Sequence, residues 1–145
     1  MRTTRIIFFW AVCLFALSFS ASSALAKHKG VVIQVSTNDV KVINLAINNA
    51  FNLSSTLGVA NIDIEIVAYG PGLAMFRANS PVADRLRQLY ALGNVSFGIC
   101  NNTITKMNLT RNDLLADAFV DESIVPGGVV RIMELQDEGW NYIRP

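Results

Sequence analysis

Residues 30–39 read GVVIQVSTND, and this stretch decides the fold class. Val31 to Val35 form an almost unbroken apolar run, which is typical of a strand buried on both faces of a sheet. Residues 36–39 are small or polar and favour the N-terminus of a helix. Apolar residues then recur near helical spacing from Val40 to Leu57, before Gly58. The chain therefore starts its folded part with a strand that leads directly into a helix.

The same alternation continues to the C-terminus. We predict further strands at 62–68, 95–99, 118–125 and 140–143, and helices at 81–92 and 129–138. Short helical segments are expected near 73–76, 104–107 and 110–113, and Ser80-Pro81 is typical of a helix start. Strands that alternate with helices through short loops pair in parallel with right-handed crossovers. The prediction is a three-layer α/β/α domain with a doubly wound, mainly parallel sheet of five strands.

The N-terminus has the three parts of a signal peptide. Arg2 and Arg5 are positive, residues 6–21 carry no charge and are mostly apolar, and Ala24-Leu25-Ala26 is a small-x-small cleavage pattern. A membrane anchor would need about 20 apolar residues, and serines interrupt this stretch. We therefore predict a signal peptide at 1–26, a single α/β domain at 27–145, and a periplasmic or secreted protein without a membrane anchor after cleavage.

Cleavage also changes the charge and the cysteine content. Without Arg2 and Arg5 the chain keeps 10 basic residues against 11 acidic ones, so no basic surface for nucleic acid is expected. Cys13 leaves with the signal peptide, so an internal disulfide is excluded and Cys100 becomes the sole thiol. His28, the single histidine, follows the cleavage site. One Cys and one terminal His are too few for an ordinary zinc site, and no cofactor is indicated.

Candidate binding residues lie where the predicted strands end, because ligands of open α/β sheets bind outside the carboxyl ends of the strands. Cys100 stands between a strand end and a helix start, where backbone N–H groups and the helix dipole favour a thiolate. The alternative interpretation is a small buried residue at the strand end. The predicted ligand-binding residues in these loops are Asn38, Tyr69, Gly70, Gly72, Asn101, Asn102, Thr103 and Gly127.

Taken in order along the chain, these motifs resemble the DsrE/DsrF-like family of sulfur-relay proteins, in its exported single-domain branch. The motifs that carry the resemblance are 31–35 with its loop, Asn48-Asn49-Ala50, residues 65–72, Ser80-Pro81-Val82-Ala83, residues 100–103, residues 125–129 and the ending 139–145. The resemblance implies a three-layer α/β fold, homo-oligomers such as trimers or hexamers, and a cysteine at the position of Cys100 that carries sulfur as a persulfide.

Three functions remain open from the sequence. In the first, the chain is a sulfur carrier or a sulfurtransferase, and Cys100 exchanges sulfur with donor and acceptor proteins or small thiols. In the second, it is a non-catalytic oligomeric module that binds a small anion or a partner protein, and Cys100 is structural. Met75 and Phe76 would then be available to a subunit interface, although core packing is the favoured interpretation. A third role is a mixed disulfide with another molecule.

Overall fold

The computed structural model describes residues 29–145, so the predicted signal peptide lies outside the described residues. Five parallel strands form one sheet in the order β4-β3-β2-β1-β5. Their bounds are β1 (Lys29–Val35), β2 (Ile62–Ala68), β3 (Val95–Cys100), β4 (Ile124–Val125) and β5 (Asn141–Ile143). The prediction of a five-stranded parallel sheet is therefore confirmed.

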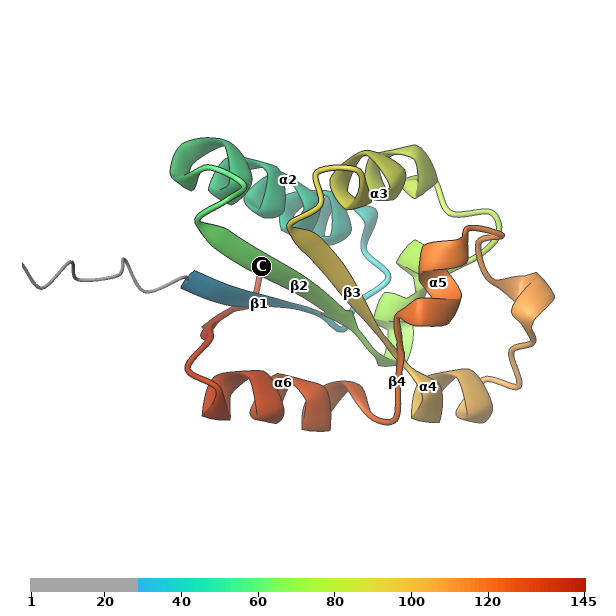
Figure 1. Cartoon of the computed structure of the whole chain (residues 1–145). Helices are drawn as coiled ribbons and strands as arrows, with labels where there is room; N and C mark the ends of the chain where they lie inside the picture. Colours follow the sequence, from blue (N-terminus) through green and yellow to red (C-terminus); the bar gives the residue numbers. More distant parts are fainter. Residues whose placement is uncertain (1–28) are drawn as a thin grey trace, which may run out of the picture.

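Helices cover both faces of this sheet. The α-helices are α2 (Val40–Leu57), α3 (Ala83–Tyr90), α4 (Asn101–Lys106), α5 (Ala118–Glu122) and α6 (Gly128–Asp137), and two short 3-10 segments are η1 (Gly70–Phe76) and η2 (Arg111–Asp113). Figure 1 shows α2 and α3 over one face and α6 over the other, as a three-layer α/β/α fold requires. Within residues 29–145, no helix is long and apolar enough to cross a membrane.

The hydrophobic core is divided by the sheet. The larger cluster joins the strands to α2, α3 and α5, and it includes Met75 and Phe76, both fully buried, so their assignment to the core is confirmed. The smaller cluster lies under α6 and consists of Val32, Val67, Ile132 and Leu135. Alternate residues of β1 and β2 contribute to the two clusters, because successive side chains of a strand point to opposite faces.

The prediction of one strand over 118–125 is wrong. These residues form α5 followed by β4, which is two residues long. Phe119, Val120 and Ser123 are the buried positions, and this spacing is helical rather than alternating. The Ser123 hydroxyl donates to the carbonyl of Phe119 over 2.6 Å, which closes the helical turn.

The helix predicted at 81–92 also differs from the structure at both ends. It covers Ala83 to Tyr90 alone. The preceding turn is held instead by the Ser80 hydroxyl, which accepts the Val82 N–H over 3.4 Å.

The strand order places a topological switch between β3 and β4. The segments that follow β1, β2 and β3 contribute to the larger cluster, whereas α6, which follows β4, contributes to the smaller cluster on the other face. The crossovers thus leave β3 and β4 in opposite directions. Cys100 and Val125 are register partners at the carboxyl ends of these two strands. In open α/β sheets this is the position where ligands bind.

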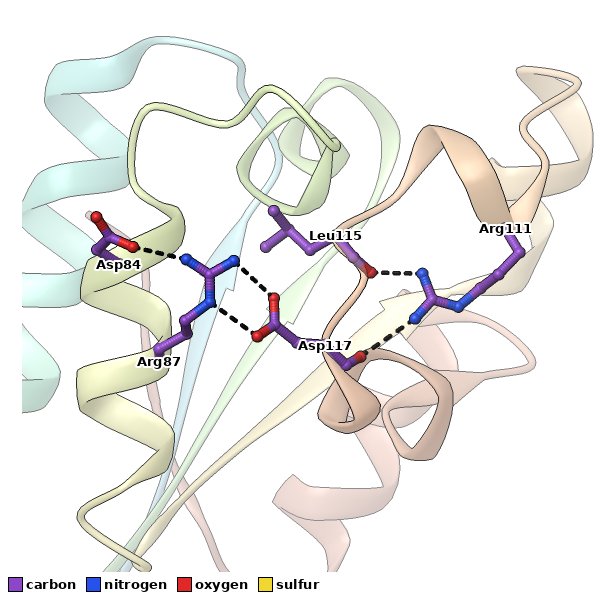
Figure 2. Close-up of polar contacts among 5 residues, drawn as sticks. All are labelled: Asp84, Arg87, Arg111, Leu115 and Asp117. Carbon is purple, nitrogen blue, oxygen red and sulfur yellow. Dashed lines mark hydrogen bonds and ion pairs between the residues drawn. The ribbon is translucent and has the colours of Figure 1, made fainter.

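Two arginines hold the segment between α4 and α5, and one of them, Arg87, ties it to α3 (Figure 2). Arg87 of α3 donates to both carboxylate oxygens of Asp117, at 2.8 and 2.9 Å, and to Asp84 at 2.6 Å. Arg111 donates to the carbonyls of Leu115 and Asp117. Both guanidinium groups are therefore committed to positioning the chain between the end of α4 and the start of α5.

Candidate functional site

Cys100 lies at the switch between β3 and β4. It is the last residue of β3 and the N-cap of α4, and its thiol is free. The start of α6 approaches the same sulfur from the other side of the sheet. Cys100 is 5% exposed, so the sulfur is nearly enclosed by the strand ends and the two helix starts.

The surroundings of the thiol favour its ionised form. Burial alone would raise the pKa of Cys100, but the Thr103 hydroxyl and the backbone N–H groups of Gly128, Thr103 and Asn102 outweigh burial. The net result is a pKa below that of an ordinary cysteine. The sulfur makes no side-chain cap hydrogen bond to α4. The N–H groups that lower the pKa belong to the first turns of α4 and α6, and together they are called the cradle of Cys100 below.

Thr103 connects this cradle to the loop after β2. It is 8% exposed, and its hydroxyl oxygen accepts the backbone N–H of Gly70 over 2.9 Å. The hydroxyl hydrogen remains available for donation, and a hydrogen bond from it to the Cys100 sulfur is one cause of the lowered pKa of that thiol. Gly70 has φ 53°, a left-handed conformation that glycine adopts without strain. The predicted site residues Gly70, Thr103 and Cys100 are therefore brought together.

The sequence pointed to Gly127, whereas the structure gives the closer role to its neighbour Gly128. Gly127 is the N-cap of α6, and a methyl group there would lie 3.4 Å from the side-chain amide nitrogen (Nδ2) of Asn102. Gly128 supplies the N–H that acts on the thiol, and a methyl group there would lie 2.9 Å from Cβ of Tyr69. Gly128 was missed because the Gly-Gly pair does not reveal which residue faces the sulfur. The pair itself was the available signal.

The other predicted residues are placed unequally around Cys100. Tyr69 is half-buried beside Gly128, and its N–H donates to the Val35 carbonyl over 3.2 Å. Gly72 is buried with its Cα against β1, where a methyl group would lie 2.1 Å from the Val35 carbonyl oxygen, so packing explains this glycine.

Asn38, Asn101 and Asn102 are the predicted residues that are exposed to solvent. Asn101 is exposed on the first turn of α4. Asn38 is exposed after β1, and β1 is separated from β3 by β2. The strand order therefore places Asn38 away from the thiol.

A groove of about 380 Å³ begins beside this cradle, where Gly127 and Val125 form one end of its lining. From there it follows β3 and α6 to Glu65. Glu65 is 3% exposed and receives two hydrogen bonds from Arg131, at 2.9 and 2.7 Å. Across the described part of the chain, no group of three or more His, Cys, Asp or Glu side chains is arranged to hold a metal ion.

Comparisons with known proteins agree with this fold. The chain is similar to a protein of unknown function, MTH1491 from Methanobacterium thermoautotrophicum, with 32% identity and a TM-score of 0.72, over 81% of this chain and 99% of that one. It shares its fold with a conserved protein of unknown function, BT1422 from Bacteroides thetaiotaomicron, at 12% identity and a TM-score of 0.60, over 84% of this chain and 99% of that one. No curated protein matches.

The family assignment comes from the sequence match. The model of the DsrE/DsrF-like family matches residues 29–145, which is the whole described part of the chain. The match includes every strand of the sheet and the loops around Cys100. The resemblance of the sequence motifs to the family is therefore confirmed, its exported branch stays a prediction, and the chain belongs to the DsrE/DsrF-like family.

Proposed function

We propose that this protein is a sulfur carrier that holds sulfur as a persulfide on Cys100 and passes it between a donor and an acceptor. Membership of the DsrE/DsrF-like family supports a role related to sulfur relay. The observation that carries the proposal is the position of the Cys100 thiol at the topological switch, at the starts of α4 and α6, whose N–H groups lower its pKa. A thiolate is the nucleophilic form of cysteine, and the cradle provides it without a neighbouring base.

The transfer needs no change in total oxidation state. The Cys100 thiolate attacks the outer sulfur of a donor persulfide, the donor S–S bond breaks, and the donor leaves as a thiolate. Cys100 then carries S–SH, with the proton on its outer sulfur. An acceptor thiolate attacks that sulfur, the new S–S bond of Cys100 breaks, and Cys100 is restored as a thiolate. The N–H groups of Gly128, Thr103 and Asn102 stabilise the Cys100 thiolate at the start and end of the cycle.

The chain needs partners for both half-reactions. Cys100 is the single cysteine of residues 27–145, so a second thiol from the same chain is not available to resolve the persulfide. The donor and the acceptor are then proteins or small thiols. Export to the periplasm or beyond, and a homo-oligomer of trimer or hexamer size, belong to the same proposal. N-terminal sequencing of the mature protein and light scattering test these two points.

The direct test is mass spectrometry of the intact protein after incubation with a small persulfide donor. The expected result is the addition of one sulfur atom, removed by a thiol acceptor and absent in Cys100→Ser. Circular dichroism of Cys100→Ser serves as the control for folding. If several persulfide and polysulfide donors leave the wild-type mass unchanged, the proposal is wrong.

The burial of Cys100 favours one alternative function. At 5% exposure, the thiol fits a structural role in a binding module as well as a guarded reactive site. Iodoacetamide separates the two functions. Alkylation of Cys100 at the same rate in native and urea-unfolded protein supports the sulfur carrier, whereas alkylation that requires unfolding supports the binding module.

A further inference from the structure

The edge of β3 next to the groove is not covered by a strand. β4 pairs with the last two residues of β3 alone, so the edge from Val95 to Gly98 has no partner strand among the described residues. The Ile99 N–H donates to the Ser123 carbonyl on this side, over 2.7 Å. Phe97 lies two residues earlier, so its N–H and C=O point the same way.

The groove is floored by this free edge. Phe97 lines the groove, yet its ring is packed against Phe76 and Phe119 in the larger core cluster. Phe97 is 4% exposed, and its main-chain N–H and C=O on this side have no partner strand among the described residues. Unpaired N–H and C=O groups on a sheet edge are a template for another strand.

The walls of the groove are apolar and acidic. Ile124 is 40% exposed and Val130 is 55% exposed, and both line the groove. Three glutamates also line it, against one arginine. Arg131 is hydrogen-bonded to Glu65 and also lies 3.7 Å from the carboxylate of Glu134. One arginine against three glutamates still leaves an excess of negative charge in the groove, to which the exposed Glu122 and Glu134 contribute. A small anion is repelled here, whereas a cationic ligand with apolar side chains is complementary.

We propose that this groove binds an extended, basic segment of a partner protein, which adds to the free edge of β3 as a further strand. Main-chain hydrogen bonds to the edge give affinity in this mode of recognition, and side-chain pockets give selectivity. The inference rests on the proposed function, because it assigns the place where a sulfur donor or acceptor docks. The groove ends at Gly127, next to the N–H of Gly128 that acts on Cys100, so a docked segment is led toward the sulfur.

The test uses the Cys100→Ser protein, so that binding is measured without thiol chemistry. The probe is a fluorescein-labelled hexapeptide of alternating lysine and valine, followed by fluorescence anisotropy at low salt. Peptides of alternating glutamate and valine, and a lysine–valine peptide N-methylated at alternate residues, are the peptide controls. Glu134→Lys tests the wall charge, and Asp137→Lys is its matched control, because Asp137 lies on the same helix outside the groove lining.

Saturable binding of the lysine–valine peptide is expected, with little binding of either control peptide. Glu134→Lys weakens it about tenfold or more, and Asp137→Lys leaves it within about twofold. Hydrogen exchange shows the Phe97 amide protected when the peptide is present. The proposal is overturned by no binding, by equal weakening in the two variants, or by no protection of Phe97. It is also overturned if Val130→Glu converts a wild-type oligomer to monomers, because a second copy then covers the groove.

These results are independent of the persulfide test. If Cys100 takes up sulfur and the peptide does not bind, the docking inference falls and the sulfur carrier stands. If the peptide binds and no persulfide forms, the groove is supported as a partner-binding site and the proposal of a sulfur carrier is wrong.

Discussion

Replacing Gly128 or Gly127 with alanine separates two neighbours that the sequence cannot distinguish. At Gly128 the new methyl group would lie 2.9 Å from Cβ and 3.1 Å from Cδ1 of Tyr69, so Tyr69 or the start of α6 must shift. At Gly127 the nearest atom to the new methyl group is the side-chain amide nitrogen (Nδ2) of Asn102, at 3.4 Å, which is an ordinary van der Waals contact. Gly127 has φ −151°, which alanine also adopts. One substitution is therefore expected to disturb the site and the other is not.

The magnitudes follow from these contacts. Overpacking at Gly128 costs about 1–3 kcal/mol of unfolding free energy, whereas Gly127→Ala stays within about 1 kcal/mol of wild type. Displacement of the Gly128 N–H also removes a donor from the thiolate of Cys100. A hydrogen bond to a charged group contributes about 1.5–3 kcal/mol. The pKa of Cys100 is therefore expected to rise in Gly128→Ala.

Two assays test this prediction. Urea unfolding gives the free energies, and the pH dependence of Cys100 alkylation gives its apparent pKa. Gly128→Ala should lower the unfolding free energy and raise the apparent pKa of Cys100, while Gly127→Ala leaves the alkylation midpoint unchanged. Equal midpoints in the two variants would refute the assignment of the Gly128 N–H to the cradle.

Three further predictions concern the framework. Arg131→Met should destabilise the fold by about 3 kcal/mol because Glu65 is left buried without a partner, and Glu65→Gln should cost about 1 kcal/mol. Urea unfolding of the two variants tests whether Arg131→Met loses more unfolding free energy than Glu65→Gln. Gly72→Ala should cost at least about 3 kcal/mol, because the methyl group meets the Val35 carbonyl oxygen at 2.1 Å; a cost below that of Gly128→Ala would contradict this geometry. The hydrogen bonds from Arg87 lower the pKa of Asp117, so that pairing stabilises the fold above the ordinary carboxyl pKa and is lost as pH falls through the lowered value. The stability difference between wild type and Asp117→Asn should then begin to shrink below about pH 4 and disappear only below the lowered pKa of Asp117. A difference that stays constant as the pH falls through this range would argue against the pairing.

The central strands and the long helix were predictable because each carries its own pattern. Residues 40–57 and 62–68 have the predicted bounds, since burial on one helix face or on both faces of a strand selects apolar residues in a local period. The prediction of a strand over residues 118–125 was wrong. The buried positions of this stretch have the spacing of one helical turn, and a strand of two residues follows directly after them. An apolar run of that length does not distinguish a strand from a short helix.

The candidate site was predictable only in part, because it depends on the strand order. The position of Cys100 between a strand and a helix was readable locally. The approach of α6 to the sulfur was not, since β4 must lie beside β3 before Gly128 can reach Cys100. The same order moves Asn38 two strands away. The pairing of Glu65 with Arg131, 66 residues later, likewise requires the packed sheet and helix.

The most direct test of this account is the apparent pKa of Cys100 in the native protein, from the rate of iodoacetamide alkylation against pH. The cradle of N–H groups and the Thr103 hydroxyl predicts a midpoint below that of the same thiol in the urea-unfolded protein, with alkylation of the native protein that does not require urea. A midpoint above that value, or alkylation that appears only on unfolding, would contradict the account and leave Cys100 as a buried structural residue.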